Sequence, residues 1–197
     1  MPAFPFAIKA HAFRAASIRA ALAVVWIGLW SAAGMTDARS QGSDSPSPEA
    51  QQSLDRDIGR MSDCYHPVNQ GCVVDLLDPD FVERGGGRDK LVQTMISVMN
   101  EMSQHGFDVR PEQTQFDKPG AITPFGSVLI AKTTTRVAAI VRGQAGTIVG
   151  TMLALSRDGG KSWRFIEATK ATRPELEARF SGLWDRLAIP DTRLVPQ

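Results

Sequence analysis

Two long runs rich in Val, Ile, Ala and Thr, at residues 128–141 and 147–155, constrain the fold of this chain most strongly. The segment Gly143-Gln144-Ala145-Gly146 lies between them and is typical of a hairpin turn. Residues 163–168 follow after another turn as a third strand, and residues 107–116 are expected to form a strand before all three. Strands that follow one another through short turns predict a consecutive antiparallel sheet.

Helical periodicity precedes this sheet. A helix is expected to begin at Ser47-Pro48, because proline suits the first helical position, and to stop before Pro67. A turn or two of helix is expected at residues 72–77, and the clearest helix spans residues 88–104. The apolar face of that helix carries Leu91, Met95, Val98, Met99 and Met102. Such a stripe most often packs into a core, although methionines also form adaptable binding surfaces.

A last helix is expected after the sheet. Thr172 and Glu175 have the spacing of a capping box, and the helix that they open is expected to end at Pro190. Helices gathered on one face of an antiparallel sheet define an α+β domain. We place this domain at residues 48–190, with a short tail at 191–197. No alternation of strands and helices is visible, which argues against a dinucleotide-binding fold.

The N-terminal leader, residues 1–38, predicts a secretory signal peptide. Lys9, Arg14 and Arg19 precede an uncharged apolar run at residues 20–35, and small residues follow it. An uncleaved membrane anchor is the alternative, but this run is shorter than the roughly 20 residues that a spanning helix needs. We therefore expect a periplasmic or secreted protein.

Charge is balanced beyond the leader. Residues 39–197 hold 19 basic and 20 acidic side chains, and they begin with a polar segment at 39–47 that is typical of a flexible linker. This balance provides no electrostatic footprint for nucleic acid or for an anionic membrane surface. Neither is expected as a partner once the leader has been cleaved.

The chain has two cysteines, Cys64 and Cys72. An even count at short spacing in an oxidising compartment favours a disulfide between them. A metal site that includes His66 is the alternative, but two cysteines and one histidine leave such a site a ligand short. We expect neither a metal nor a cofactor.

Two stretches of the chain resemble a known family. The first runs from Asp78-Pro79-Asp80-Phe81-Val82 through Gly85-Gly86-Gly87-Arg88-Asp89-Lys90-Leu91 to Gly106-Phe107, and the second is residues 152–166. With them, residues 50–190 resemble exported bacterial members of the nuclear-transport-factor-2-like (NTF2-like) superfamily, which includes the SnoaL-like and ketosteroid-isomerase-like domains. The resemblance implies a cone, in which a strongly curved antiparallel sheet wraps against N-terminal helices around an apolar pocket. The C-terminal helix and the cysteine pair go beyond the family's minimal pattern.

The longest strand predicts which side chains line this pocket. One parity of residues 129–141 is apolar apart from the hydroxyls of Thr133 and Thr135, whereas the other parity carries cations. With Met95 and Met99 from the helix, these threonines form the predicted site for a small apolar ligand. The alternative is a filled core in which the threonines only favour the strand.

Tyr65, His66 and Asp75 are the candidates for catalysis. Isomerases of the family that the chain resembles need a carboxylate base, with a tyrosine and a protonated acid as hydrogen-bond donors. Tyr65 is the only tyrosine of the chain, and Asp75, Asp78 and Asp80 follow it closely. The alternative is that Tyr65 and His66 merely fill a turn.

One further motif fits the Asp-box of sialidase-like propellers, Ser156-x-Asp158-x-Gly160-x-Ser162-Trp163. Physically this motif is a hairpin, in which the aspartate caps turn amides, the glycine permits positive φ and the tryptophan packs beneath. A propeller needs several such blades, and this chain holds a single copy. We therefore interpret the motif as structural.

These features lead to three hypotheses for the function. The first is an exported domain without enzymatic activity that binds a small apolar ligand or a partner protein, in its pocket or on its sheet. The second is a SnoaL-like isomerase or dehydratase that acts on a small hydrophobic substrate. The third is a homodimer in which the open sheet face pairs with a second copy.

Overall fold

The structure is a computed structural model, and it describes residues 47–197. The expected signal peptide and nearly all of the expected linker lie outside the described residues. The helices and strands, in chain order, are α1 (Pro48–Asp63), α2 (Gln70–Leu76), α3 (Pro79–Arg84), α4 (Arg88–Gln104), β1 (Phe107–Phe116), β2 (Thr123–Phe125), β3 (Val128–Val141), β4 (Gln144–Ser156), β5 (Arg164–Glu167), α5 (Arg173–Arg179), α6 (Leu183–Leu187) and β6 (Arg193–Pro196).

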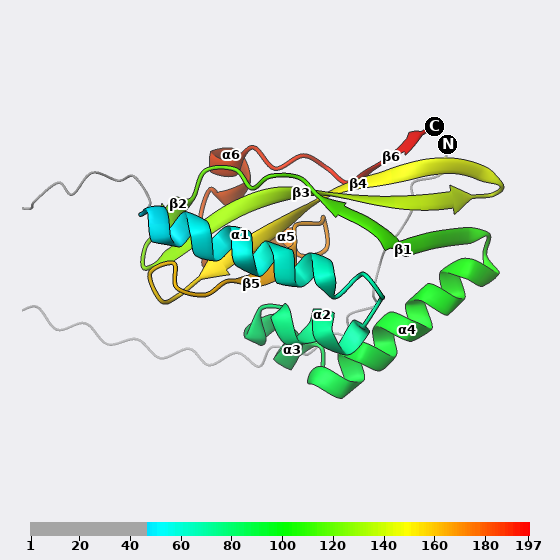
Figure 1. Cartoon of the computed structure of the whole chain (residues 1–197), viewed down its shortest axis with the longest axis horizontal. Coiled ribbons are helices and arrows are strands. Elements are labelled where there is room, and N and C mark those ends of the chain that lie inside the picture. The colour runs from blue at the N-terminus through cyan, green and yellow to red at the C-terminus, as the bar shows by residue number, and fades with distance from the viewer. Residues whose placement is uncertain (1–46) are drawn as a thin grey trace, which may run out of the picture. The chain divides into compact units, whose positions relative to one another are not determined.

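The sheet is antiparallel and curls into a half-barrel (Figure 1). Its order is β1-β3-β4-β5, while β2 pairs with β3 and β6 pairs with β4. The long β3–β4 hairpin is its centre, with Leu129 opposite Ser156 at one end and Val141 opposite Gln144 at the other. The prediction of an α+β domain built on a consecutive antiparallel sheet is therefore confirmed.

The turn of this hairpin differs from the predicted one. Arg142 and Gly143 form it with φ of 51° and 82°, as a tight two-residue turn requires. Gly146 instead lies inside β4, where a Cβ atom would meet the side chain of Leu194 at 3.0 Å and the carbonyl oxygen of Val195 at 3.1 Å. This glycine allows β6 to approach, so residues 193–196 form a strand where a tail was expected.

Helices cover both faces of the sheet, whereas the sequence predicted helices on one face. Side chains alternate along β4, so that Met152 and Ala154 pack with α1 and α2, and Leu153 and Leu155 pack with α5 and α6. We call the first face the inner face and the second the outer face. Each face has its own buried cluster, because the C-terminal segment folds back over the side that the N-terminal helices leave open.

The predicted C-terminal helix is divided in two. Gly182 adopts φ of 72° and separates α5 from α6. The predicted capping box is also wrong, because the backbone of Thr172 is helical rather than extended, and its side chain makes no cap. The Thr172 hydroxyl instead donates to the carbonyl oxygen of Glu167 at 2.7 Å, and Glu175 pairs with Arg84.

The Asp-box hairpin packs against α1. Trp163 is fully buried; its indole N–H donates to the Ser53 hydroxyl at 2.9 Å, and its backbone N–H donates to Asp57 at 3.0 Å. Within the turn, burial opposes the charge of Asp158, but hydrogen bonds from Ser162, Ser156 and Lys161 hold its pKa well below the usual range. The motif therefore has the structural role that was predicted for it.

Cys64 and Cys72 form the predicted disulfide, with a Cα–Cα distance of 5.5 Å. The bond joins the end of α1 to α2 and is consistent with an oxidising extracellular compartment. We expect the double variant Cys64→Ser/Cys72→Ser to lose about 2–3 kcal/mol of unfolding free energy, because the closed loop is short. Urea unfolding followed by circular dichroism measures this loss, and wild type under reducing conditions should reproduce it. A variant as stable as oxidised wild type would contradict this expectation.

Candidate functional site

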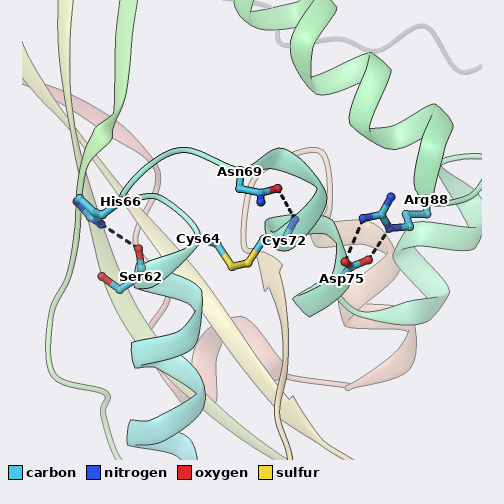
Figure 2. The surroundings of a disulfide bond; sticks show 7 residues. All are labelled: Ser62, Cys64, His66, Asn69, Cys72, Asp75 and Arg88. Carbon is cyan, nitrogen blue, oxygen red and sulfur yellow. Dashed lines mark hydrogen bonds and ion pairs between the residues drawn. A yellow bond between two sulfur atoms is a disulfide. The ribbon is translucent and has the colours of Figure 1, made fainter.

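The structure does not bring the three catalytic candidates together. The His66 ring lies against the end of α1, with its Nδ1 atom 2.9 Å from the carbonyl oxygen of Ser62. Asp75 accepts two hydrogen bonds from Arg88, at 2.6 and 3.1 Å, which hold its pKa below the usual value. Figure 2 shows His66 and Asp75 on opposite sides of the disulfide, His66 bonded to Ser62 and Asp75 to Arg88.

Tyr65 belongs to a different group of side chains. Its ring is half-buried and packs against Phe116 of β1, with the ring centroids 5.9 Å apart and the planes tilted by 48°. Burial raises the pKa of Tyr65 to about 12, and the negative charge of Glu167 contributes to this increase. Tyr65 and Glu167 are therefore electrostatic neighbours, although 102 positions separate them in the sequence.

Glu167 lies on the inner face of the sheet, at the end of β5. It pairs with the buried Met152 across the strands and shares its face with the buried Phe165. The side chain is exposed to solvent, and desolvation by the surrounding protein raises the pKa of its carboxyl. The sequence analysis did not select this residue. Its position could have been inferred, because Glu167 follows Phe165 by two positions and therefore lies on the same face of the strand.

Threonines extend this surface across the neighbouring strands. Thr135 is buried opposite Gly150, where a Cβ atom would lie 3.1 Å from the Thr135 hydroxyl. The hydroxyl of the buried Thr133 donates to the carbonyl oxygen of Asp117 at 2.6 Å. Thr114 is 4 % exposed, and its hydroxyl oxygen has no hydrogen-bond partner within residues 47–197. Alternation along β1 places Thr114 on the same face as Phe116.

We define the inner site as Tyr65, Phe116, Thr135, Met152 and Glu167. These residues come from the α1–α2 connection and from strands β1, β3, β4 and β5. Phe116 pairs with Thr135, and Met152 pairs with Glu167, so the four strand residues lie in two neighbouring rows on the same face of the sheet. The site combines two aromatic rings, two hydroxyls, one thioether and one carboxyl.

Helix α4 contributes part of its methionine stripe to this region. Met95 is half-buried and packs against the inner cluster, while Met99 is half-buried further along the helix. Leu91 is the only buried residue of α4, and Ile96 and Val98 are 36 % and 39 % exposed. The stripe is therefore less buried than a core helix would be.

A groove of about 580 Å³ lies elsewhere in the described structure and is lined by strands β1, β3, β4 and β6 together with His66. Gln115, Arg136 and Val149 are cross-strand neighbours in this groove, and they alternate with the inward-facing threonines. Arg136 is already paired with Asp117, at 3.1 Å. None of the predicted ligand residues, Thr133, Thr135, Met95 and Met99, lines this groove.

Comparisons with known proteins leave the family open. No family model, curated protein or solved structure matches this chain. Within residues 47–197, no group of three or more metal-ligating side chains is present. The same part of the chain contains no helix with the length and apolar character needed to cross a membrane.

Replacement of Glu167 by glutamine is expected to stabilise the protein at neutral pH. The unfolded carboxyl loses its proton near pH 4.3, whereas the folded carboxyl keeps its proton to higher pH. Folding therefore binds protons in this range, and wild-type stability falls as pH rises through the raised pKa. Glutamine avoids this loss, so the variant should be more stable than wild type at pH 7.5 and equally stable below about pH 4.

Urea unfolding at both pH values measures this difference. Glu112→Gln, which alters an exposed glutamate on β1, is the matched control and should change stability little at either pH. A Glu167→Gln variant that is less stable than wild type at pH 7.5 would contradict the expectation that the ionised carboxylate of Glu167 lowers the free energy of unfolding.

Proposed function

We propose that this chain is an exported binding protein whose inner site holds a small, largely apolar molecule. The observation that carries the proposal is the pair of half-buried aromatic rings of Tyr65 and Phe116, which pack together and against the inner cluster but keep part of their surface open to solvent. Partly exposed aromatic rings offer a large apolar contact surface to a ligand. A small apolar molecule that covers these rings removes this surface from water.

The surroundings of the inner site suit such a ligand. Met95 and Leu77 are partly buried and pack against the same inner cluster as Tyr65 and Phe116. The Thr114 hydroxyl adds a hydrogen-bonding group without a protein partner. Ligand sites are mostly apolar, with a few convergent polar groups. The resemblance to NTF2-like domains supports the same location, because it implies an apolar pocket between the sheet and the helices.

Binding of N-phenyl-1-naphthylamine, a neutral apolar dye, tests this proposal. Wild type is expected to raise the fluorescence of the dye in a saturable way. Met95→Asp places a charge in the apolar wall and should weaken binding by at least about tenfold, because burying an unpaired charge is costly. Ile96→Asp is the matched control on the exposed part of the same helix and should bind as wild type does. No saturable binding by wild type, or equal losses in both variants, would contradict the proposal.

Export is the second part of the proposal, and the disulfide supports it because such bonds persist in oxidising compartments. Native mass spectrometry of protein expressed in a bacterium from the full sequence tests it. We expect a mass that lacks residues 1 to about 38 and the two hydrogens lost to the disulfide. The same spectrum reports a retained ligand or a homodimer. An intact leader on the purified protein would contradict cleavage.

A further inference from the structure

The groove of about 580 Å³ that strands β1, β3, β4 and β6 line has a floor and two walls. Ala138 of β3 and Thr147 of β4 are cross-strand partners in its floor. Val195 of β6 lines one wall, and β6 comes this close to β4 because Gly146 has no side chain. A smaller hollow of about 160 Å³ shares Ala138 with the groove and continues it toward the turn of the β3–β4 hairpin. The two hollows together form an elongated depression across four strands.

Strand β1 bulges where it forms the other wall. Its register against β3 shifts between Arg110 and Gln115, so that β1 carries extra residues there. Glu112 and Gln113 lie in this bulge, and together with Gln115 they line the groove. Bulges redirect side chains and are frequent next to functional sites. The irregularity of β1 therefore presents polar side chains to the groove.

Several side chains of the groove are free to donate and to accept hydrogen bonds. Gln113 and Gln115 have no side-chain partner within residues 47–197, and each amide offers two N–H donors and one acceptor oxygen. The ring of His66, which also lines the groove, donates through Nδ1 to the carbonyl oxygen of Ser62. Its Nε2 atom is therefore an acceptor in the neutral ring.

Charge in the depression is mostly neutralised. Arg136 is paired with Asp117 at 3.1 Å, and Arg110, which lines the smaller hollow, is paired with Asp108 at 3.1 Å. Among the described residues, Glu112 is the only acidic side chain that lines the groove, and it has no ion pair. Glu112 repels an anion, and a cation gains little from one exposed carboxylate. The lining therefore favours a neutral, polar ligand.

We propose that this groove binds a neutral oligosaccharide. Each sugar hydroxyl both donates and accepts hydrogen bonds, as the free amides of Gln113 and Gln115 do. The carbon faces of the sugar rings contact the small apolar surface of Ala138, Val149 and Val195. The volume of the groove lies within the range of about 300–1,000 Å³ that is usual for ligand sites.

The sheet disfavours a peptide as the ligand. A peptide that adds a strand needs an exposed sheet edge. In the floor of the groove, β3 lies between β1 and β4, and β4 lies between β3 and β6, so both strands are paired on each side. The groove is separate from the inner site, and this proposal does not rest on the proposed function.

Isothermal titration calorimetry with three neutral trisaccharides, chitotriose, cellotriose and maltotriose, tests the proposal. We expect at least one of them to bind wild type in a saturable way. Trigalacturonate, an acidic trisaccharide, and the peptide tetraalanine should each bind at least about tenfold more weakly than that sugar. Binding of none of the three neutral sugars overturns the proposal, and so does an acidic sugar or peptide that binds as tightly.

Two double variants test whether the sugar occupies the groove. Gln113→Leu/Gln115→Leu removes two amides and should weaken binding at least about fivefold, because each lost hydrogen bond reduces affinity modestly. Gln93→Leu/Gln104→Leu, on α4, is the matched control and should bind as wild type does. All four glutamines are exposed, so both variants should fold, which far-UV circular dichroism checks. Equal losses in both variants, or displacement of N-phenyl-1-naphthylamine by the sugar, would overturn the assignment to the groove.

Discussion

Replacement of Trp163 by alanine is expected to lower the free energy of unfolding by about 3–5 kcal/mol. Trp163 is fully buried in the inner cluster. The substitution removes its apolar surface and leaves the Ser53 hydroxyl without the indole N–H. It also loosens the contact between α1 and the Asp-box turn, where a Cβ atom on Gly160 would already lie 2.5 Å from Ala50. Urea unfolding followed by far-UV circular dichroism measures the loss.

Conservative variants separate the contribution of the hydrogen bond from the contribution of the packed ring. Trp163→Phe keeps a buried ring but loses the hydrogen bond to Ser53, which is expected to cost about 1–2 kcal/mol. Trp184→Phe is the matched control, because Trp184 is 7 % exposed and its indole N–H has no partner within residues 47–197. It should lose less stability than Trp163→Phe. Equal losses would show that the bond to Ser53 contributes nothing.

Replacement of Asp78 by alanine is expected to cost about 2–4 kcal/mol of unfolding free energy. Its carboxylate is fully buried and accepts the Phe81 backbone N–H at 3.3 Å, which caps α3. It also accepts a hydrogen bond from Arg157 at 2.7 Å and pairs with Arg179 at 3.4 Å. The variant therefore disconnects α3, the turn after β4 and α5 at one point.

Asp80 provides the control for this prediction. It pairs with the same two arginines, but its side chain is 53 % exposed, so Asp80→Ala should cost about 0–1 kcal/mol. The loss in Asp80→Ala should decrease further at high salt, because mobile ions screen exposed pairs. If Asp78→Ala lost no more stability than Asp80→Ala, the result would contradict the expectation that the buried carboxylate contributes more to stability than the exposed one.

Part of the candidate site can be predicted from the sequence, and part of it cannot. The sequence predicts Thr133 and Thr135 on the inward parity of β3, and both are buried there, because alternation is a local property of a strand. Tyr65 stands out in the sequence because it is the only tyrosine of the chain. Its ring partner Phe116 cannot be predicted from the sequence, because this contact depends on how β1 packs against the α1–α2 connection.

The sequence by itself determined the local elements of this protein: α1, α4, the long β3–β4 hairpin and the Cys64–Cys72 pair. Each of them follows from periodicity, capping or spacing within a short stretch of chain. Only the tertiary structure decided that α5 and α6 cover the outer face, that Gly146 admits β6 and that Tyr65 packs against Phe116. These features depend on the packing of segments that lie far apart in the chain. Such long-range contacts produce no periodic pattern in the sequence.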